Sequence, residues 1–244
     1  MNIPGVCGIV RGSVIPGMLA VEAGQSAVGD IFKWFVDKHL PKQYADGNPY
    51  VNLEREAARL RPGESGLLAL DWNNGNRTIL VDPLLSGLLI GQTLGTSAAE
   101  IYRALVEATA FGALVIIKRV EEYGLKIREV VTGGGLAEKS PFMMQIYADI
   151  LNRPIKTARS PQACALGAAM FGAVAAGEFG GDIFAAQKAM AGVKEKVYTP
   201  IKENAKIYAK LFTLYKQLHD AFGVAGTKID LSGLMKELIK LRIK

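Results

Sequence analysis

Three consecutive glycines, Gly133–Gly135, follow a run of β-branched residues and precede Ser140 and Pro141, a pair typical of a helix start. Glycines after a strand let the backbone approach a ligand, and the free amides at a helix N-terminus attract anions. The spacing is neither GxGxxG nor GxxxxGKS, so it indicates neither a Rossmann nor a Walker motif. The pattern predicts either a nucleotide-binding turn or a tight turn without a ligand.

A second cluster of polar residues is the segment EAGQS, residues 22–26, where Glu22 and Gln25 flank a glycine at the expected start of a helix. Carboxylates bind sugar hydroxyls well because they accept several directional hydrogen bonds. An ordinary acidic first turn of a helix is the alternative. Asp71 and Asp82 bracket a polar loop, whose amides Asp71 is equally able to cap. No spacing fixes two carboxylates together, so we assign no catalytic residue.

Cysteine and histidine are too few for a zinc site, since only Cys7, Cys164, His39 and His219 occur and no CxxC pair is present. We expect both cysteines to be small buried apolar residues, and their number fits a reducing cytoplasm. The N-terminus shows no basic and then apolar signal-peptide pattern, and no segment has about 18 consecutive apolar residues. We therefore expect a cytoplasmic chain without a metal site and without a membrane partner.

The net charge of +6 over 244 residues is unevenly distributed. Half of it, +3, lies in residues 224–244, and the remainder of the chain is near balance. No stretch interleaves basic with aromatic residues as a groove for single-stranded nucleic acid does. The charge therefore predicts no nucleic-acid partner.

Alternating strand and helix patterns after residue 66 indicate an α/β fold. The clearest helix begins at Ser97, which forms a capping box with Glu100, and ends at Gly124. The glycine-rich first 25 residues predict a β-hairpin, and the small residues of 163–177 predict a helix that approaches a neighbouring backbone closely. The other expected helices cover 26–40, 53–60, 202–222 and a segment from 140, and the other expected strands cover 66–72, 127–132 and 154–158.

Residues 1–222 are expected to form one domain, and residues 223–244 a basic amphipathic helical tail. In the tail, Leu231, Leu234, Met235, Leu238 and Ile239 recur at helical spacing with lysines between them. Such a helix either lies on a membrane surface or docks on its own domain.

Several longer strings resemble the C-terminal lobe of the FGGY family of carbohydrate kinases, and within that family its ribulokinases. The strings are EAGQSAVGD (22–30), PGESGLLALDW (62–72), NGNR (74–77), EIYRALVEATA (100–110), GGGLAEKSPFMMQIYAD (133–149), SPQA (160–163) and LGAA (166–169). The resemblance extends over residues 3–222. A further family-wide pattern runs from Gly87 to Glu107 and departs at Gln92, where the family has an aliphatic residue.

The resemblance implies an α/β, actin-like and ribonuclease-H-like ATPase lobe with a mixed sheet flanked by helices. It implies that ATP lies in a cleft between two lobes, with Mg²⁺ held mainly by the other lobe. Glu22 is implied to contact the sugar, with Gln25 beside it, and residues 71–77 to lie near the cleft. The residues implied to line the adenosine pocket are Gly133, Gly134, Gly135 and Ser140, joined by Gln145 and Gln162.

In this family, the general-base aspartate, the Gly-Thr-Ser phosphate loop and the N-terminal lobe all precede the segment that resembles this chain. We therefore expect the chain to be inactive without that lobe, its expected partner in cis or as a separate chain. The implied reaction is ATP-dependent phosphorylation of L-ribulose to L-ribulose 5-phosphate in arabinose catabolism. A non-catalytic remnant or nucleotide-responsive interaction module, and a lobe for another ketose, remain alternatives. An exposed cleft face would also favour a homo-oligomer.

Overall fold

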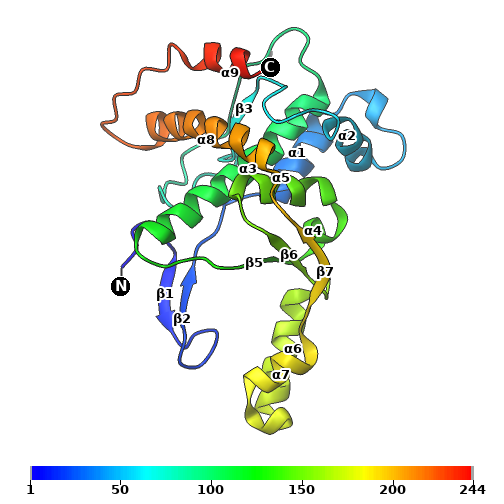
Figure 1. The fold of residues 1–244 in the computed structure, drawn as a ribbon, viewed down its shortest axis with the longest axis vertical. Coiled ribbons are helices and arrows are strands. Elements are labelled where there is room, and N and C mark those ends of the chain that lie inside the picture. Colours follow the sequence, from blue (N-terminus) through cyan, green and yellow to red (C-terminus); the bar gives the residue numbers. More distant parts are fainter. Residues whose placement is uncertain (1, 243–244) are drawn as a thin grey trace.

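The computed structural model describes residues 2–242 (Figure 1). Met1, Ile243 and Lys244, at the outer ends of the two expected segments, lie outside the described residues. The helices are α1 (Gly29–His39), α2 (Pro49–Ala57), α3 (Ala98–Glu122), α4 (Gly135–Lys139), α5 (Pro141–Leu151), α6 (Ala163–Ala175), α7 (Ile183–Met190), α8 (Lys202–Gly223) and α9 (Leu234–Arg242), with single 3-10 turns at Lys42–Tyr44 and Glu178–Gly181. The strands are β1 (Gly8–Arg11), β2 (Leu19–Glu22), β3 (Leu68–Leu70), β4 (Leu88–Ile90), β5 (Val130–Thr132), β6 (Ile155–Ala158) and β7 (Val193–Tyr198).

The long helix α3 lies at the centre of the molecule and packs against α1, α2, α5 and β3 (Figure 1). Most of its residues are buried, which explains why it is apolar nearly all round rather than on one stripe. Helix α8 closes the core from the other side of β3 with buried Tyr208, Leu211, Tyr215 and Leu218. The core therefore consists of helices around a short buried strand.

Among the described residues, the strands form three small sheets rather than one. Figure 1 shows two of them, the β1–β2 hairpin and the sheet of β5, β6 and β7. Strands β1 and β2 form an antiparallel hairpin, and β3 pairs antiparallel with β4. The third sheet is mixed, because β5 and β6 run parallel while β6 and β7 run antiparallel. The expected α/β class with a mixed sheet is confirmed, and the parallel pair brings the carboxyl ends of β5 and β6 to one edge.

The helix boundaries follow local capping chemistry. Ser97 and Glu100 form the expected capping box of α3, and Ser140 Oγ accepts a hydrogen bond of 3.1 Å from the Met143 amide at the start of α5. The helix expected over 53–60 begins earlier, at residue 49, because the Asn48 side chain caps the Tyr50 amide with a proline at the first position. That correction moves part of an expected loop into α2.

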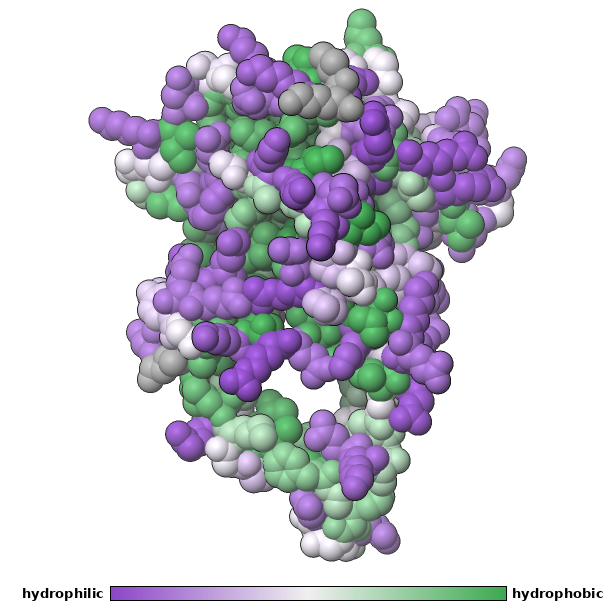
Figure 2. Space-filling model, in the orientation of Figure 1, coloured by the Kyte–Doolittle hydropathy of each residue, from purple (hydrophilic) through white to green (hydrophobic). Residues whose placement is uncertain are grey.

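The expectation that both cysteines are buried is wrong. Cys7 and Cys164 are both exposed free thiols rather than buried apolar residues. Cys164 lies in α6, which has no buried residue although it is rich in small apolar ones. The helix approaches a neighbouring backbone at its first residue, where the Cβ of Ala163 lies 3.1 Å from the position of a Cβ on Gly133. Helices α6 and α7 project from the body (Figure 1), and Figure 2 shows hydrophobic residues on the surface of this projection.

Part of the expected helical tail, residues 234–242, forms the amphipathic helix α9 and docks on the body, whereas residues 224–233, with Leu231 of the expected stripe, are not helical. Leu234 and Leu238 are buried, whereas Met235 and Ile239 are exposed. The turn at Gly63 lies within van der Waals reach of the helix. None of the described helices is long and apolar enough to cross a membrane.

Candidate functional site

The glycine turn lies at the edge of the mixed sheet where β5 and β6 end. Gly134 has a φ of +90°, a conformation that favours glycine, and it precedes α4. A Cβ on Gly133 would lie 3.1 Å from the Cβ of Ala163, at the start of α6. The segments after both parallel strands therefore meet, which is where ligands bind in open α/β sheets.

The backbone at this turn is open to an incoming molecule. A Cβ on Gly134 or Gly135 would meet no atom within 4 Å, so the glycines leave space rather than fill a packed turn. Ser140 is 4% exposed and is used as the cap of α5. Of the six residues expected in the adenosine pocket, the three glycines are therefore the accessible ones at the turn, and Ser140 supports the helix that follows.

The two glutamines of the expected pocket lie in different surroundings. Gln145 Nε2 donates hydrogen bonds of 2.8 Å to Asp149 Oδ1 and 2.9 Å to the Thr199 carbonyl, which ties α5 to the segment before α8. Gln162 is exposed at the N-terminal end of α6, beside the glycine turn. Gln162 is therefore positioned near the opening, whereas the Gln145 amide nitrogen is already bonded within the fold.

The EAGQS segment docks on the polar loop of residues 71–78. Glu22 and Arg77 form an exposed ion pair of 2.9 Å between Oε1 and Nη2. The Gly24 amide donates to Thr78 Oγ1 at 3.0 Å, and the Arg77 amide donates to Ser26 Oγ at 2.9 Å. Ser26 therefore joins the two loops rather than capping α1. The structure thus brings together two segments that the sequence analysis treated separately.

Beneath this surface, Gln25 is held by a buried carboxylate. Gln25 Nε2 donates to Asp71 Oδ2 at 2.6 Å and to the Thr109 carbonyl at 2.8 Å. The Tyr215 hydroxyl donates to Asp71 Oδ1 at 3.0 Å. Burial raises the pKa of Asp71 to about 6, although these hydrogen bonds act in the opposite direction. The suggestion that Asp71 caps its own loop is thus replaced by a contact with the EAGQS segment.

The EAGQS segment and the glycine turn lie near each other. A Cβ on Gly29, just after the EAGQS segment, would lie 3.3 Å from Cδ1 of Leu136, just after the glycine turn. The start of α1 therefore touches α4. Sequence positions more than a hundred residues apart form one continuous region at this end of the fold.

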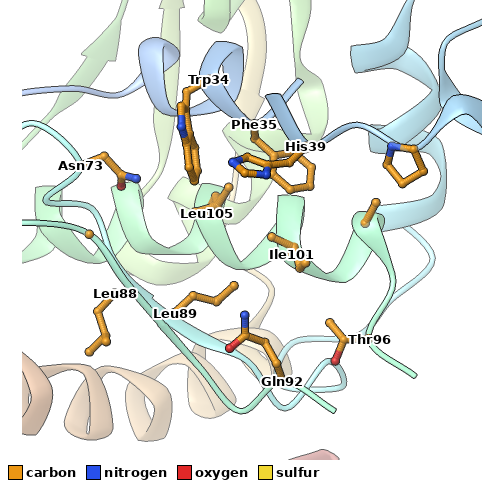
Figure 3. Close-up of a pocket in the computed structure, with 13 residues that line it drawn as sticks. Trp34, Phe35, His39, Asn73, Leu88, Leu89, Gln92, Thr96, Ile101 and Leu105 are labelled. Atoms are coloured by element: carbon orange, nitrogen blue, oxygen red, sulfur yellow. The ribbon is translucent and has the colours of Figure 1, made fainter. Parts of the chain in front are cut away.

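Sequence reasoning missed a cavity of about 530 Å³ between α1 and β4, floored by α3. Figure 3 shows Trp34, Phe35 and His39 of α1 facing Leu88 and Leu89. Asn73 lines both this cavity and an adjoining one of about 500 Å³ that reaches Asp30. No sequence pattern indicated a cavity here, and no strand was expected over 88–90, where β4 faces α1.

No group of three or more His, Cys, Asp or Glu residues is arranged to hold a metal ion within residues 2–242. The acidic residues of the site are Glu22, paired with Arg77, and Asp71, paired with Gln25 and Tyr215.

The sequence matches known proteins along nearly its whole length. The model described as "FGGY family of carbohydrate kinases, C-terminal domain" matches residues 1–176. A ribulokinase from Halalkalibacterium halodurans is 52% identical over 231 residues, covering 91% of this chain and 41% of the relative. A ribulokinase from Bacillus licheniformis is 47% identical over 249 residues, covering 98% of this chain and 44% of the relative. The chain thus spans less than half the length of these curated relatives.

Solved structures show the same arrangement of elements. The xylulose kinase from Rhodospirillum rubrum is similar with a TM-score of 0.72 and 25% identity, over 91% of this chain and 42% of that one. The gluconate kinase from Lactobacillus acidophilus gives a TM-score of 0.67 and 28% identity, over 81% of this chain and 38% of that one.

Proposed function

Because the chain belongs to the FGGY family of carbohydrate kinases and is the C-terminal domain of such a kinase, we propose that it is the adenosine-binding lobe of an ATP-dependent L-ribulose kinase. The reaction is transfer of the ATP γ-phosphoryl group to L-ribulose, which gives L-ribulose 5-phosphate. The high identity to ribulokinases, compared with that to the xylulose and gluconate kinases, favours this ketose.

The observation that carries the proposal is the contact between Gly29 and Leu136. It makes the EAGQS segment and the glycine turn neighbours, as a phosphoryl transfer between two bound substrates requires. A nucleotide at the glycine turn and a sugar at Glu22 would then lie at the same end of the lobe.

The geometry of the glycine turn supports nucleoside binding independently of the family resemblance. Gly134 and Gly135 leave open space where side chains would lie, and their backbone amides remain near the start of a helix. Gly133, Gly134 and Gly135 would approach the nucleoside, Gln162 would border it, and Ser140 and Gln145 would support the pocket from behind. We assign Mg²⁺ mainly to the phosphates and to the N-terminal lobe, since ATP supplies oxygen ligands that this metal prefers.

Exposed features of the fold support an N-terminal lobe as the partner. Within residues 2–242, β1 pairs only with β2 and β5 only with β6, so each presents one open edge. Val10 and Val131, on these strands, are 54% and 49% exposed, and α6 has no buried residue. Open edges and uncovered apolar surface are features that a partner normally covers. We place the assembled kinase in the cytoplasm, with which the free Cys7 and Cys164 thiols are compatible.

The test measures ADP release with L-ribulose and Mg-ATP. The chain is assayed alone, and mixed with the N-terminal lobe of the Halalkalibacterium halodurans ribulokinase after binding of the two has been verified by analytical ultracentrifugation. Ribulose-dependent activity in the mixture, absent from either lobe alone, supports the proposal. Activity of the chain alone contradicts the need for the other lobe. A bound but inactive mixture favours a remnant or an interaction module, and preference for another ketose in a sugar panel overturns the substrate.

A further inference from the structure

Gln25, which is itself half-buried, is the residue of the EAGQS segment whose side chain donates to buried groups of the fold. Its amide nitrogen carries two protons, and both have partners: Asp71 Oδ2 at 2.6 Å and the Thr109 carbonyl at 2.8 Å. A carbonyl accepts only, and an ionised carboxylate accepts only. The two contacts therefore fix which end of the amide points inward. Gln25 Oε1 has no hydrogen bond among the described residues and remains free to accept one.

The carboxylate that receives Gln25 is itself held from two sides. Tyr215 of α8 donates to Asp71 Oδ1 at 3.0 Å, and both side chains are buried. On the other side, Gly112 of α3 faces the contact directly. A Cβ there would lie 2.3 Å from Asp71 Oδ2 and 2.7 Å from Gln25 Nε2. A glycine in the middle of a long helix weakens it, so its presence is explained by the space that this contact needs.

Asp71 is too enclosed to touch a sugar. The cavity beside it has a volume of about 10 Å³, which is room for one water molecule. It is lined by the same Gln25, Asp71, Gly112 and Tyr215, together with His219. The carboxylate therefore acts on a ligand only through the residue that it holds.

We propose that Asp71 is a positioning residue that fixes the Gln25 amide, with Tyr215 and Gly112 as the parts of the fold that keep the carboxylate in place. The ligand group is a sugar hydroxyl that donates to Gln25 Oε1. This inference rests on the proposed function for the identity of the ligand, but the orientation of Gln25 is a property of this chain alone.

The first experiment uses the chain by itself and needs no activity. The side-chain NH₂ signals of Gln25 are followed in ¹⁵N–¹H spectra, assigned through Gln25→Glu. Asp71→Ala is expected to move both signals towards the positions of solvent-exposed glutamines. Asp71→Asn keeps an acceptor oxygen for Gln25 and an NH₂ group for the Tyr215 oxygen, so the signals stay downfield of exposed ones.

Tyr208→Phe is the matched control for Tyr215→Phe. Tyr208 lies two turns earlier on α8, is equally buried and is hydrogen bonded to Arg103 and Glu107. Tyr215→Phe is expected to shift the Gln25 signals, whereas Tyr208→Phe lowers stability and leaves them in place. Equal Gln25 shifts in both tyrosine variants, or no shift in Asp71→Ala, would overturn the positioning role.

The second experiment measures sugar kinetics in the kinase assembled with an N-terminal lobe. Asp71→Ala is expected to raise KM for the sugar roughly tenfold with a much smaller change in kcat, and Asp71→Asn to restore most of the affinity. A shifted Gln25 signal with unchanged KM would reject the sugar contact while leaving the orientation intact. Absence of kinase activity in the unsubstituted assembly would instead count against the proposed function.

Discussion

The Glu22 carboxylate lies 2.9 Å from the Arg77 guanidinium, and both side chains are more than half exposed. The two residues are 55 positions apart, Glu22 at the end of β2 and Arg77 in the polar loop. Hydrogen bonds from the Gly24 amide to Thr78 and from the Arg77 amide to Ser26 join the two segments. An ion pair this exposed contributes little to stability. It does keep the Glu22 carboxylate at a defined place on the surface, next to Gln25.

A substitution of Glu22 is therefore expected to change sugar binding while leaving the stability of the fold nearly unchanged. Glu22→Gln is expected to change the free energy of unfolding by less than about 0.5 kcal/mol, because exposed pairs contribute so little. In the assembled kinase it is expected to raise KM for L-ribulose roughly tenfold, since a neutral amide accepts hydrogen bonds more weakly than a carboxylate. Urea unfolding and steady-state kinetics provide the two measurements.

Asp37→Asn serves as the control for Glu22→Gln, because Asp37 forms an exposed ion pair with Lys33 on α1. It is expected to leave both stability and KM unchanged. Equal kinetic effects of the two substitutions would remove Glu22 from the sugar site.

Gly112→Ala tests the packing of α3 on Asp71. Alanine normally stabilises a helix interior by about 1 kcal/mol relative to glycine. Here the new methyl group would lie 2.3 Å from Asp71 Oδ2, so the substitution is expected to destabilise the fold by about 1–3 kcal/mol. Gly172→Ala, on exposed α6, places its methyl group in open space and is expected to be neutral or stabilising. Chemical denaturation measures the free energy of unfolding of both variants. A Gly112→Ala variant more stable than the unsubstituted chain would contradict the close approach of Gly112 to Asp71.

The raised pKa of Asp71 predicts a pH dependence of stability. Its pKa is about 6 in the folded chain against 3.8 ordinarily, so the folded state binds more protons between these values. Stability is therefore expected to fall as pH rises from about 4 to about 6, by on the order of 3 kcal/mol from this group. Burial lowers the pKa of nearby His219, which has the opposite effect near its ordinary pKa of 6.5.

The difference between the unsubstituted chain and Asp71→Asn isolates this contribution, because His219 is present in both. Unfolding free energies are measured in urea from pH 4 to pH 7. The difference is expected to change steeply up to about pH 6 and then to level off. A constant difference across the range would show that Asp71 titrates normally.

Gly135→Ala tests the glycine turn without disturbing the fold. A Cβ at this position meets no atom within 4 Å and the residue needs no positive φ, so stability is expected to be unchanged. The methyl group would occupy space that we assign to the nucleoside, and affinity for ADP is expected to fall roughly tenfold. Isothermal titration calorimetry measures this binding. The matched variant Gly167→Ala, also in open space, is expected to bind ADP normally.

Two adjacent residues of α9 test the docking of the tail. Leu238 is 1% exposed, and Leu238→Ala is expected to destabilise the chain by about 2–4 kcal/mol. Ile239 is 54% exposed, and Ile239→Ala is expected to change stability by less than about 0.5 kcal/mol. Thermal unfolding measures the loss of stability in each variant. Equal small effects would indicate that the helix does not pack on the body.

The sequence by itself determined the features that depend on neighbouring residues. The capping box at Ser97, the Ser140 cap and the end of α3 just before Gly124 follow from side-chain and backbone chemistry within a few positions. The sequence also shows the EAGQS segment, the glycine turn and the family resemblance, because each is carried by contiguous residues. The residues on either side of a position do not determine which distant residue packs against it.

Only the tertiary structure decided which distant segments meet. No local pattern connects Tyr215 with Asp71, 144 positions away, or explains the glycine at 112. The same limit accounts for the errors at Cys7 and Cys164, since a small apolar residue is buried only where another element covers it. A residue is buried only when a second element packs on it, and the tertiary structure determines which elements are in contact.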